Sequence, residues 1–135
     1  MIAILVVAHK EISNNYIACV KHINGKTANN LFSFSVEKNV EPDLLRQELK
    51  QHIDKLMQFY TGVLILTDLF GATPSNIAVS LCVPGEVEVL SGLNMAMLLR
   101  ALHYSTYALS ECLDKAYSGA HAGIIKVDNQ EEGYW

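Results

Sequence analysis

Two uninterrupted apolar runs constrain the fold of this chain more than any other feature of its sequence. Residues 2–8 read IAILVVA, and residues 62–67 read GVLILT. Continuous β-branched and aliphatic runs, without alternating polar residues, are typical of strands buried on both faces of a parallel sheet. The sequence therefore predicts a sheet with two interior parallel strands.

Further strands and helices are predicted to alternate with these runs. Additional strands are expected at residues 31–36, at 86–90, where alternation indicates a place near the sheet edge, and as a short fifth strand at 124–127. Helices are expected at residues 13–22, 42–60, 74–82, 93–104 and 107–117. Alternating strands and helices imply right-handed crossovers. We therefore expect a doubly wound α/β domain, a mostly parallel sheet of order 2-1-3-4 with helices on both faces.

Length, composition and charge indicate one compact domain. The chain has 135 residues, half of them hydrophobic, which is enough to cover both faces of a sheet. We expect residues 1–128 to form the domain and residues 129–135 to form a tail. The net charge of −4, without long runs of one sign, argues against a nucleic-acid partner. The N-terminal apolar run lacks signal-peptide flanks and is too short to span a membrane, which predicts a cytoplasmic protein.

The sequence offers no signature of a metal or organic cofactor. Its three cysteines, Cys19, Cys82 and Cys112, are widely spaced among apolar neighbours, which predicts buried thiols rather than disulfides or zinc ligands. The chain contains no GxGxxG, P-loop, GxSxG or CxxC motif. We therefore expect neither a cofactor nor a metal ion.

Polar residues follow both apolar runs at the points where the predicted strands end. His9 follows the first run and Asp68 the second. In the order 2-1-3-4, these two strands are neighbours at the switch point, where doubly wound sheets bind their ligands. A carboxylate bonded to one imidazole nitrogen fixes the tautomer and leaves the other nitrogen nucleophilic. His9 and Asp68 are therefore the candidate catalytic pair.

A predicted helix start after Asp68 supplies a candidate anion site. Thr73 can act as N-cap with Pro74 at the first helical position, after a flexible turn at Gly71. Free backbone N–H groups at such a start bind phosphate. We take Gly71, Thr73 and Ser75 as candidate phosphate-binding residues. Together with the histidine and carboxylate, they predict transfer of a phosphoryl group to and from His9.

Each of these signals has an ordinary structural interpretation when it is taken alone. A histidine at a strand end is often structural, an aspartate often forms a turn, and Thr-Pro often only starts a helix. Their coincidence at adjacent strand ends favours a functional site. Asn94, after the fourth strand, is a weaker candidate. No role is predicted for the remaining histidines, which are His22, His52, His103 and His121.

With these motifs laid out, the chain resembles the mannose-type EIIA domain of the bacterial phosphoenolpyruvate-dependent sugar phosphotransferase system. The similar segments are IAILVVAH, GVLILTDLFGATPSN and EVLSGLNMAMLLRAL, in the expected order and spacing. The resemblance implies that His9 receives a phosphoryl group from the carrier HPr and passes it to a IIB component. It also implies that Asp68 bonds the imidazole and that Thr73 lies at the phosphate-binding helix start.

The resemblance further implies a homodimer that exchanges an antiparallel C-terminal strand, for which residues 124–127 are the candidate. Contact with the membrane transporter is expected only through the IIB, IIC and IID components. One position departs from the family pattern, because Lys10 stands where glycine commonly follows the histidine. Glycine would permit a positive φ and a closer approach of a partner. Lysine could instead pair with the phosphoryl group, or the donor could dock differently.

Two other functions share the same chemistry at His9. One is a regulatory module whose phosphorylated and free forms bind a partner differently, without transport. The other is the phosphocarrier subunit of a dihydroxyacetone kinase. Neighbouring genes for IIB, IIC and IID components, or for a kinase, would distinguish these alternatives, and the sequence leaves the sugar open.

Overall fold

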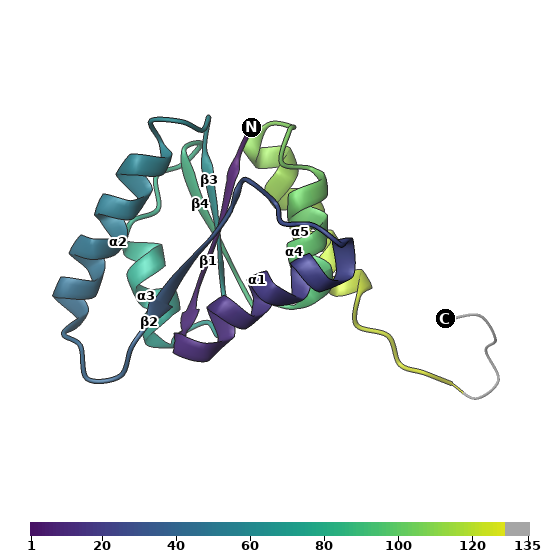
Figure 1. Cartoon of the computed structure of the whole chain (residues 1–135), viewed down its shortest axis with the longest axis horizontal. Coiled ribbons are helices and arrows are strands. Elements are labelled where there is room, and N and C mark those ends of the chain that lie inside the picture. The colour runs from purple at the N-terminus through teal and green to yellow at the C-terminus, as the bar shows by residue number, and fades with distance from the viewer. Residues whose placement is uncertain (129–135) are drawn as a thin grey trace.

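A computed structural model describes residues 1–128 of the chain, and the predicted tail at residues 129–135 lies outside the described residues. Its centre is a parallel sheet in the order β2-β1-β3-β4 (Figure 1). The strands are β1 (Ala3–His9), β2 (Leu31–Val36), β3 (Val63–Thr67) and β4 (Val87–Ser91). The predicted doubly wound fold and strand order are confirmed, and β4 is an edge strand as its alternation indicated.

Helices cover both faces of the sheet, with α2 and α3 on one side and α1, α4 and α5 on the other (Figure 1). Their bounds are α1 (Lys10–Asn24), α2 (Pro42–Leu56), α3 (Thr73–Ser80), α4 (Met95–His103) and α5 (Leu109–Ala122). All five predicted helices are present, with shifted ends. None of those in residues 1–128 combines the length and apolar character needed to cross a bilayer.

The interior strands are buried on both faces because alternate side chains enter different helical layers. On β1, Ile4 and Val6 pack in the core on the side of α4 and α5. Leu5 and Val7 pack in the core on the side of α2 and α3. This arrangement explains the unbroken apolar run in the sequence. Packing on both faces also holds β1 in place, and it thereby fixes the position of His9, which follows the buried residues of the strand.

The helices α4 and α5 approach closely because glycine stands in α5 and at its C-cap, where the two helices meet. A Cβ added at Gly119 would lie 2.9 Å from Cβ of Arg100, and one added at Gly123 would lie 2.4 Å from Cβ of Ala96. Both distances are shorter than real carbon contacts, so a larger residue requires the helices to move apart. Glycine at these positions therefore sets the helix spacing.

We expect Gly123→Ala to lower the free energy of unfolding by about 1–3 kcal/mol, because the added methyl group overlaps Ala96. Urea unfolding followed by circular dichroism would measure this change. Ser118→Ala, at an exposed position of the same helix, is the matched control and should change the free energy by less than about 0.5 kcal/mol. Equal stability of the two variants would contradict this account of the α4–α5 contact.

The predicted fifth strand is not formed within the single chain. Residues 124–128 have no regular secondary structure, and Ile124, Ile125 and Val127 are exposed. Among residues 1–128, the sheet contains no strand paired with this segment. Its β-branched residues Ile124, Ile125 and Val127 are typical of a strand, but a strand needs a partner for its backbone hydrogen bonds. Exchange of this segment between subunits stays a prediction.

The expected burial of the cysteines is correct only for Cys112. Cys112 packs in the core beneath α4, whereas Cys19 and Cys82 are exposed. Cys19 lies on an outward part of α1, and Cys82 follows the end of α3. Apolar neighbours in sequence did not predict burial, since adjacent residues of a helix face different directions.

Candidate functional site

His9 is both the last residue of β1 and the N-cap of α1. Six buried residues precede it on the strand, whereas its own side chain is 53% exposed. The chain turns into α1 at this residue, with φ −56° and ψ 151°. Buried structure on one side and a helix on the other thus hold the backbone of His9, while its imidazole faces solvent.

Asp68 follows the last residue of the neighbouring strand β3 and binds His9 twice. Its Oδ2 lies 2.5 Å from Nδ1 of His9 and accepts a hydrogen bond from the His9 backbone N–H at 3.1 Å. Its Oδ1 accepts from the Leu69 N–H at 2.9 Å. The carboxylate is only 11% exposed. Three donors therefore hold Asp68 in one orientation beside the imidazole.

This pairing defines which nitrogen of His9 can react. A carboxylate accepts hydrogen bonds, so the neutral imidazole carries its proton on Nδ1 and donates it to Asp68. Nε2 then keeps its lone pair, on a side chain that is 53% exposed. The geometry supplies an oriented nitrogen nucleophile.

The pKa of Asp68 is held below its ordinary value. Burial on its own raises the pKa, but the hydrogen bonds from the His9 backbone, the His9 side chain and the Leu69 backbone outweigh burial. Each of these bonds favours the charged carboxylate. Asp68 is therefore ionised at neutral pH and available to orient the imidazole.

Because the folded pKa of Asp68 is depressed, its charge stabilises the fold above the unfolded pKa of about 4. That contribution is lost as the pH falls through the folded value. We expect Asp68→Asn to lower the free energy of unfolding more at pH 7 than at pH 3, measured with urea. Asp54→Asn removes an exposed carboxylate that pairs with Lys50 and is the control. A pH-independent loss at Asp68 would contradict the linkage.

The loop after Asp68 turns sharply into α3. Gly71 has φ +89°, a conformation that favours glycine, and its carbonyl accepts from Nδ2 of Asn76 at 3.1 Å. The helix begins one residue earlier than predicted: Ala72 is the N-cap, since its carbonyl accepts the N–H of Asn76, and Thr73 is the first helical residue. Thr73 as N-cap was therefore wrong. Helix geometry still leaves the Thr73 and Ser75 N–H groups without an acceptor inside the helix.

The Ser75 side chain has a partner within the protein. It is buried, and its hydroxyl lies 2.9 Å from the hydroxyl of Ser91, which is 2.7 Å from that of Thr67. This chain of hydroxyls joins α3 to β4 and β3. A phosphate-binding role of Ser75 stays a prediction, and the structure leaves its backbone N–H rather than its hydroxyl for that role.

Lys10 takes the position after His9 without backbone strain. It is the first residue of α1, and among residues 1–128 the non-glycine residue with a positive φ is Asn39. The conformational reason for glycine at this position therefore does not apply here. The Lys10 carbonyl accepts from the hydroxyls of Ser13 and Ser35, which fixes the start of α1 to the end of β2.

Sequence reasoning missed an apolar rim beside the site. Leu69 and Phe70 directly follow Asp68, and both are exposed, Phe70 to 77%. In the sequence they stand among the polar residues of that segment, and two apolar residues in a turn carry no periodic signal. Large exposed apolar side chains next to a reactive group are typical of a surface that meets another protein.

The weaker candidate, Asn94, has a structural role, and two of the histidines without a predicted role pack on aromatic rings. Asn94 caps α4 by accepting from the Met97 N–H at 2.8 Å, and it donates to the Ala120 carbonyl. His52 packs on Phe34, and His121 on Tyr117. In the described part of the chain, no three His, Cys, Asp or Glu side chains are placed to hold a metal ion.

The fold and this pair define a class of protein: a doubly wound α/β domain with a carboxylate-oriented histidine at its switch point. A sequence model of the family described as EIIA-man, the PTS system fructose IIA component, matches residues 3–117. The chain therefore belongs to the EIIA-man family of the phosphotransferase system, whose members have a phosphocarrier role. A comparison with curated protein sequences gave no significant match.

Several solved structures with the same fold are described as components of the phosphotransferase system. A phosphotransferase system component EIIA from Streptococcus agalactiae is 27% identical, with a TM-score of 0.81, and the match covers 93% of this chain and 97% of that one. A mannose/sorbose specific IIA subunit from Enterococcus faecalis is 21% identical, with a TM-score of 0.82 and 96% of both chains covered. A PTS IIA protein associated with the fucose utilization operon of Streptococcus pneumoniae is 20% identical, with a TM-score of 0.81, and 93% of this chain and 92% of that one are covered.

Proposed function

We propose that His9 accepts a phosphoryl group from a phosphorylated HPr-type carrier and passes it to a IIB component for sugar uptake. The observation that carries this proposal is the contact of 2.5 Å between Nδ1 of His9 and Oδ2 of Asp68 at the sheet switch point. It leaves Nε2 as the nucleophile. Membership of the EIIA-man family supports the same role.

The transfer exchanges one N–P bond for another. Nε2 of His9 attacks the phosphorus in line, the N–P bond of the donor histidine breaks, and the electron pair of that bond returns to the donor imidazole. Each imidazole keeps the proton on its other nitrogen, so no proton moves between the proteins. Asp68 stabilises the positive charge that the His9 ring acquires on phosphorylation. Passing the group to IIB is the same step in reverse order.

The start of α3 supplies a place for the phosphoryl oxygens in this proposal. The N–H groups of Thr73 and Ser75 have no acceptor within the helix, and Gly71 allows the preceding loop to turn. Backbone N–H groups at a helix start stabilise negative charge. They would act on the charge that develops during transfer, without a metal or cofactor.

The carriers are the partners in this proposal, and a homodimer with exchanged 124–127 segments is its proposed assembly. The protein would act in the cytoplasm and meet the membrane transporter only through IIB, IIC and IID. The exposed, apolar Ile124 and Ile125 support exchange, because a second copy would bury them.

Reconstitution of the relay tests the proposal. The purified protein is incubated with phosphoenolpyruvate, enzyme I and HPr, and modification is followed by mass spectrometry at neutral pH. We expect one acid-labile phosphate per chain, located on His9 and dependent on HPr. No HPr-dependent label, or a label on another residue, would overturn the proposal.

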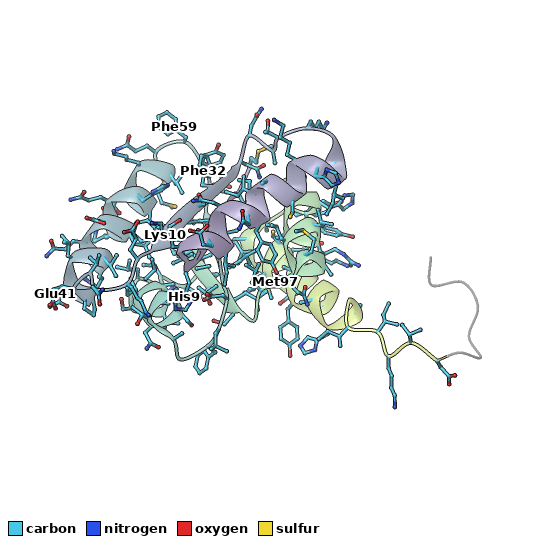
Figure 2. The ribbon with its side chains drawn as sticks, turned by 60° about the horizontal axis from the view of Figure 1, so that its bottom comes forward. His9, Lys10, Phe32, Glu41, Phe59 and Met97 are labelled. Atoms are coloured by element: carbon cyan, nitrogen blue, oxygen red, sulfur yellow. The ribbon has the colours of Figure 1, made fainter. Side chains whose placement is uncertain are left out.

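Phe70 should contribute to carrier docking rather than to chemistry, because it is exposed beside the site but not bonded to the His9–Asp68 pair. We expect Phe70→Ala to raise the KM for phospho-HPr about fivefold, as truncation of an apolar contact costs about 1 kcal/mol, with little change in kcat. Phe59→Ala is the matched control: Phe59 is 82% exposed and lies away from His9 (Figure 2). Similar kinetics of the two variants would argue against docking at Phe70.

A further inference from the structure

An exposed ion pair stands next to the reactive histidine. Nζ of Lys10 lies 3.7 Å from Oε1 of Glu37, the residue that follows β2. The Lys10 side chain is 61% exposed and that of Glu37 is 56% exposed. Figure 2 shows Lys10 beside His9 at the beginning of α1. The pair therefore spans from α1 to the end of the neighbouring strand at the edge of the site.

The backbone of Lys10 is fixed, whereas its ammonium group is free to change partners. Ser35 and Ser13 bind the Lys10 carbonyl at 3.3 and 3.4 Å. The contact with Glu37 is long and solvated, and such exposed pairs contribute little to stability. A lysine stem is flexible and its ammonium can turn toward any nearby anion. Little free energy holds Lys10 to Glu37.

A phosphoryl group on His9 would be a stronger partner than Glu37. It carries up to two negative charges and three acceptor oxygens, whereas a carboxylate carries one charge and two oxygens. Lys10 directly follows His9, with Cα atoms about 3.8 Å apart as in any trans-linked pair, so its flexible four-carbon stem begins beside the imidazole. The charged group that pairs with the His9 imidazole is Asp68, which is an anion and cannot neutralise the charge of a phosphoryl group.

We infer that Lys10 leaves Glu37 when His9 is phosphorylated and binds the phosphoryl oxygens, so that the Lys10–Glu37 pair sets how strongly this protein holds its phosphoryl group. This inference rests on the proposed phosphorylation of His9. Glu37 acts in the opposite direction, because it competes for the ammonium in the unphosphorylated protein. Lys10 thereby tunes the transfer equilibrium between this protein and its carriers, while Nε2 of His9 performs the substitution at phosphorus.

The equilibrium constant for phosphoryl transfer from phospho-HPr measures this effect, with the phosphorylated fraction read from phosphate-affinity gels. Compared with the unmodified chain, we expect Lys10→Gln to lower the constant about threefold, in keeping with an exposed charge pair. Lys10→Arg should restore it, and Glu37→Gln should raise it. In about 1 M salt the differences should shrink, because exposed charges are then screened. Unchanged constants, or failure of arginine to restore the value, would overturn the inference.

A second donor separates this inference from the proposed function. Potassium phosphoramidate phosphorylates histidine without any carrier protein, and 31P NMR then follows the pH titration of the phosphoryl group on His9. The ammonium favours the dianion, so the titration midpoint should be higher in Lys10→Gln than in the unmodified chain. A lower or equal midpoint overturns the role of Lys10. Labelling by phosphoramidate but not by phospho-HPr overturns the proposed donor alone, and labelling of His9 by neither overturns both.

Discussion

His9→Ala should abolish HPr-dependent phosphorylation of the protein. The Asp68 contact uses Nδ1 and leaves Nε2 of His9 without a bond to the carboxylate, and alanine supplies no nucleophile in its place. Among the described residues, Asp68 hydrogen-bonds no other imidazole. Loss of label to the background of a reaction without HPr is therefore expected, measured by intact mass at neutral pH.

The matched control for this variant is His121→Ala. His121 is another exposed histidine, packed against Tyr117 on α5. Its loss should leave labelling at the level of the unmodified chain. The His9 side chain lies at the surface, so the folded state should survive its removal, and circular dichroism checks this. A label that persists in His9→Ala would show that another residue carries the phosphoryl group.

Asp68→Asn should lower the rate of phosphoryl transfer to His9 by about a hundredfold or more. This is the range in which a positioned acid–base group contributes to the rate of an enzymatic reaction. Three donors point at the Asp68 carboxylate: Nδ1–H and the backbone N–H of His9, and the N–H of Leu69. An amide has one acceptor oxygen and one donor nitrogen. If its NH₂ group faces Nδ1, the imidazole proton moves to Nε2 and the nucleophilic lone pair is lost.

Rapid-quench kinetics with phospho-HPr would measure this rate, and Asp54→Asn would control for the loss of a negative charge elsewhere on the surface. The KM for phospho-HPr should change less than kcat, because Asp68 is mostly buried and acts through His9. A rate in Asp68→Asn within a fewfold of the unmodified chain would mean that the carboxylate is not needed to set the tautomer.

The strand order and the meeting of His9 with Asp68 could be predicted because short-range apolar patterns were combined with a common strand order of doubly wound sheets. Two apolar runs without alternation have to be interior strands, and interior neighbours place the residues that follow them at one edge. Val7 pairs with Thr67 in the sheet, so the residues that follow these two strands lie next to one another. No detailed side-chain packing was needed for this prediction.

The features that could not be predicted depend on contacts between distant segments. Ser75 reads as a polar residue at an anion site, but its hydroxyl bonds Ser91, which is 16 residues away. The ion pair of Lys10 depends on Glu37, which β2 brings near the start of α1. The N-cap of α3 is the residue whose carbonyl accepts the first helical hydrogen bond. The Ala72 carbonyl accepts the N–H of Asn76, so the N-cap is Ala72 and not Thr73. Side-chain partners of this kind are set by tertiary structure rather than by local sequence.

The placement of His9 at the end of a fully buried strand has a consequence for the kinetics of the relay. The imidazole and its carboxylate are anchored to β1 and β3, two central strands whose residues before the site are inaccessible to solvent. Little rearrangement of this protein is then required at each transfer. In the proposed relay each carrier would deliver its phosphorus to a nitrogen held in place, so throughput should follow carrier concentration and diffusion more than internal motion of this domain.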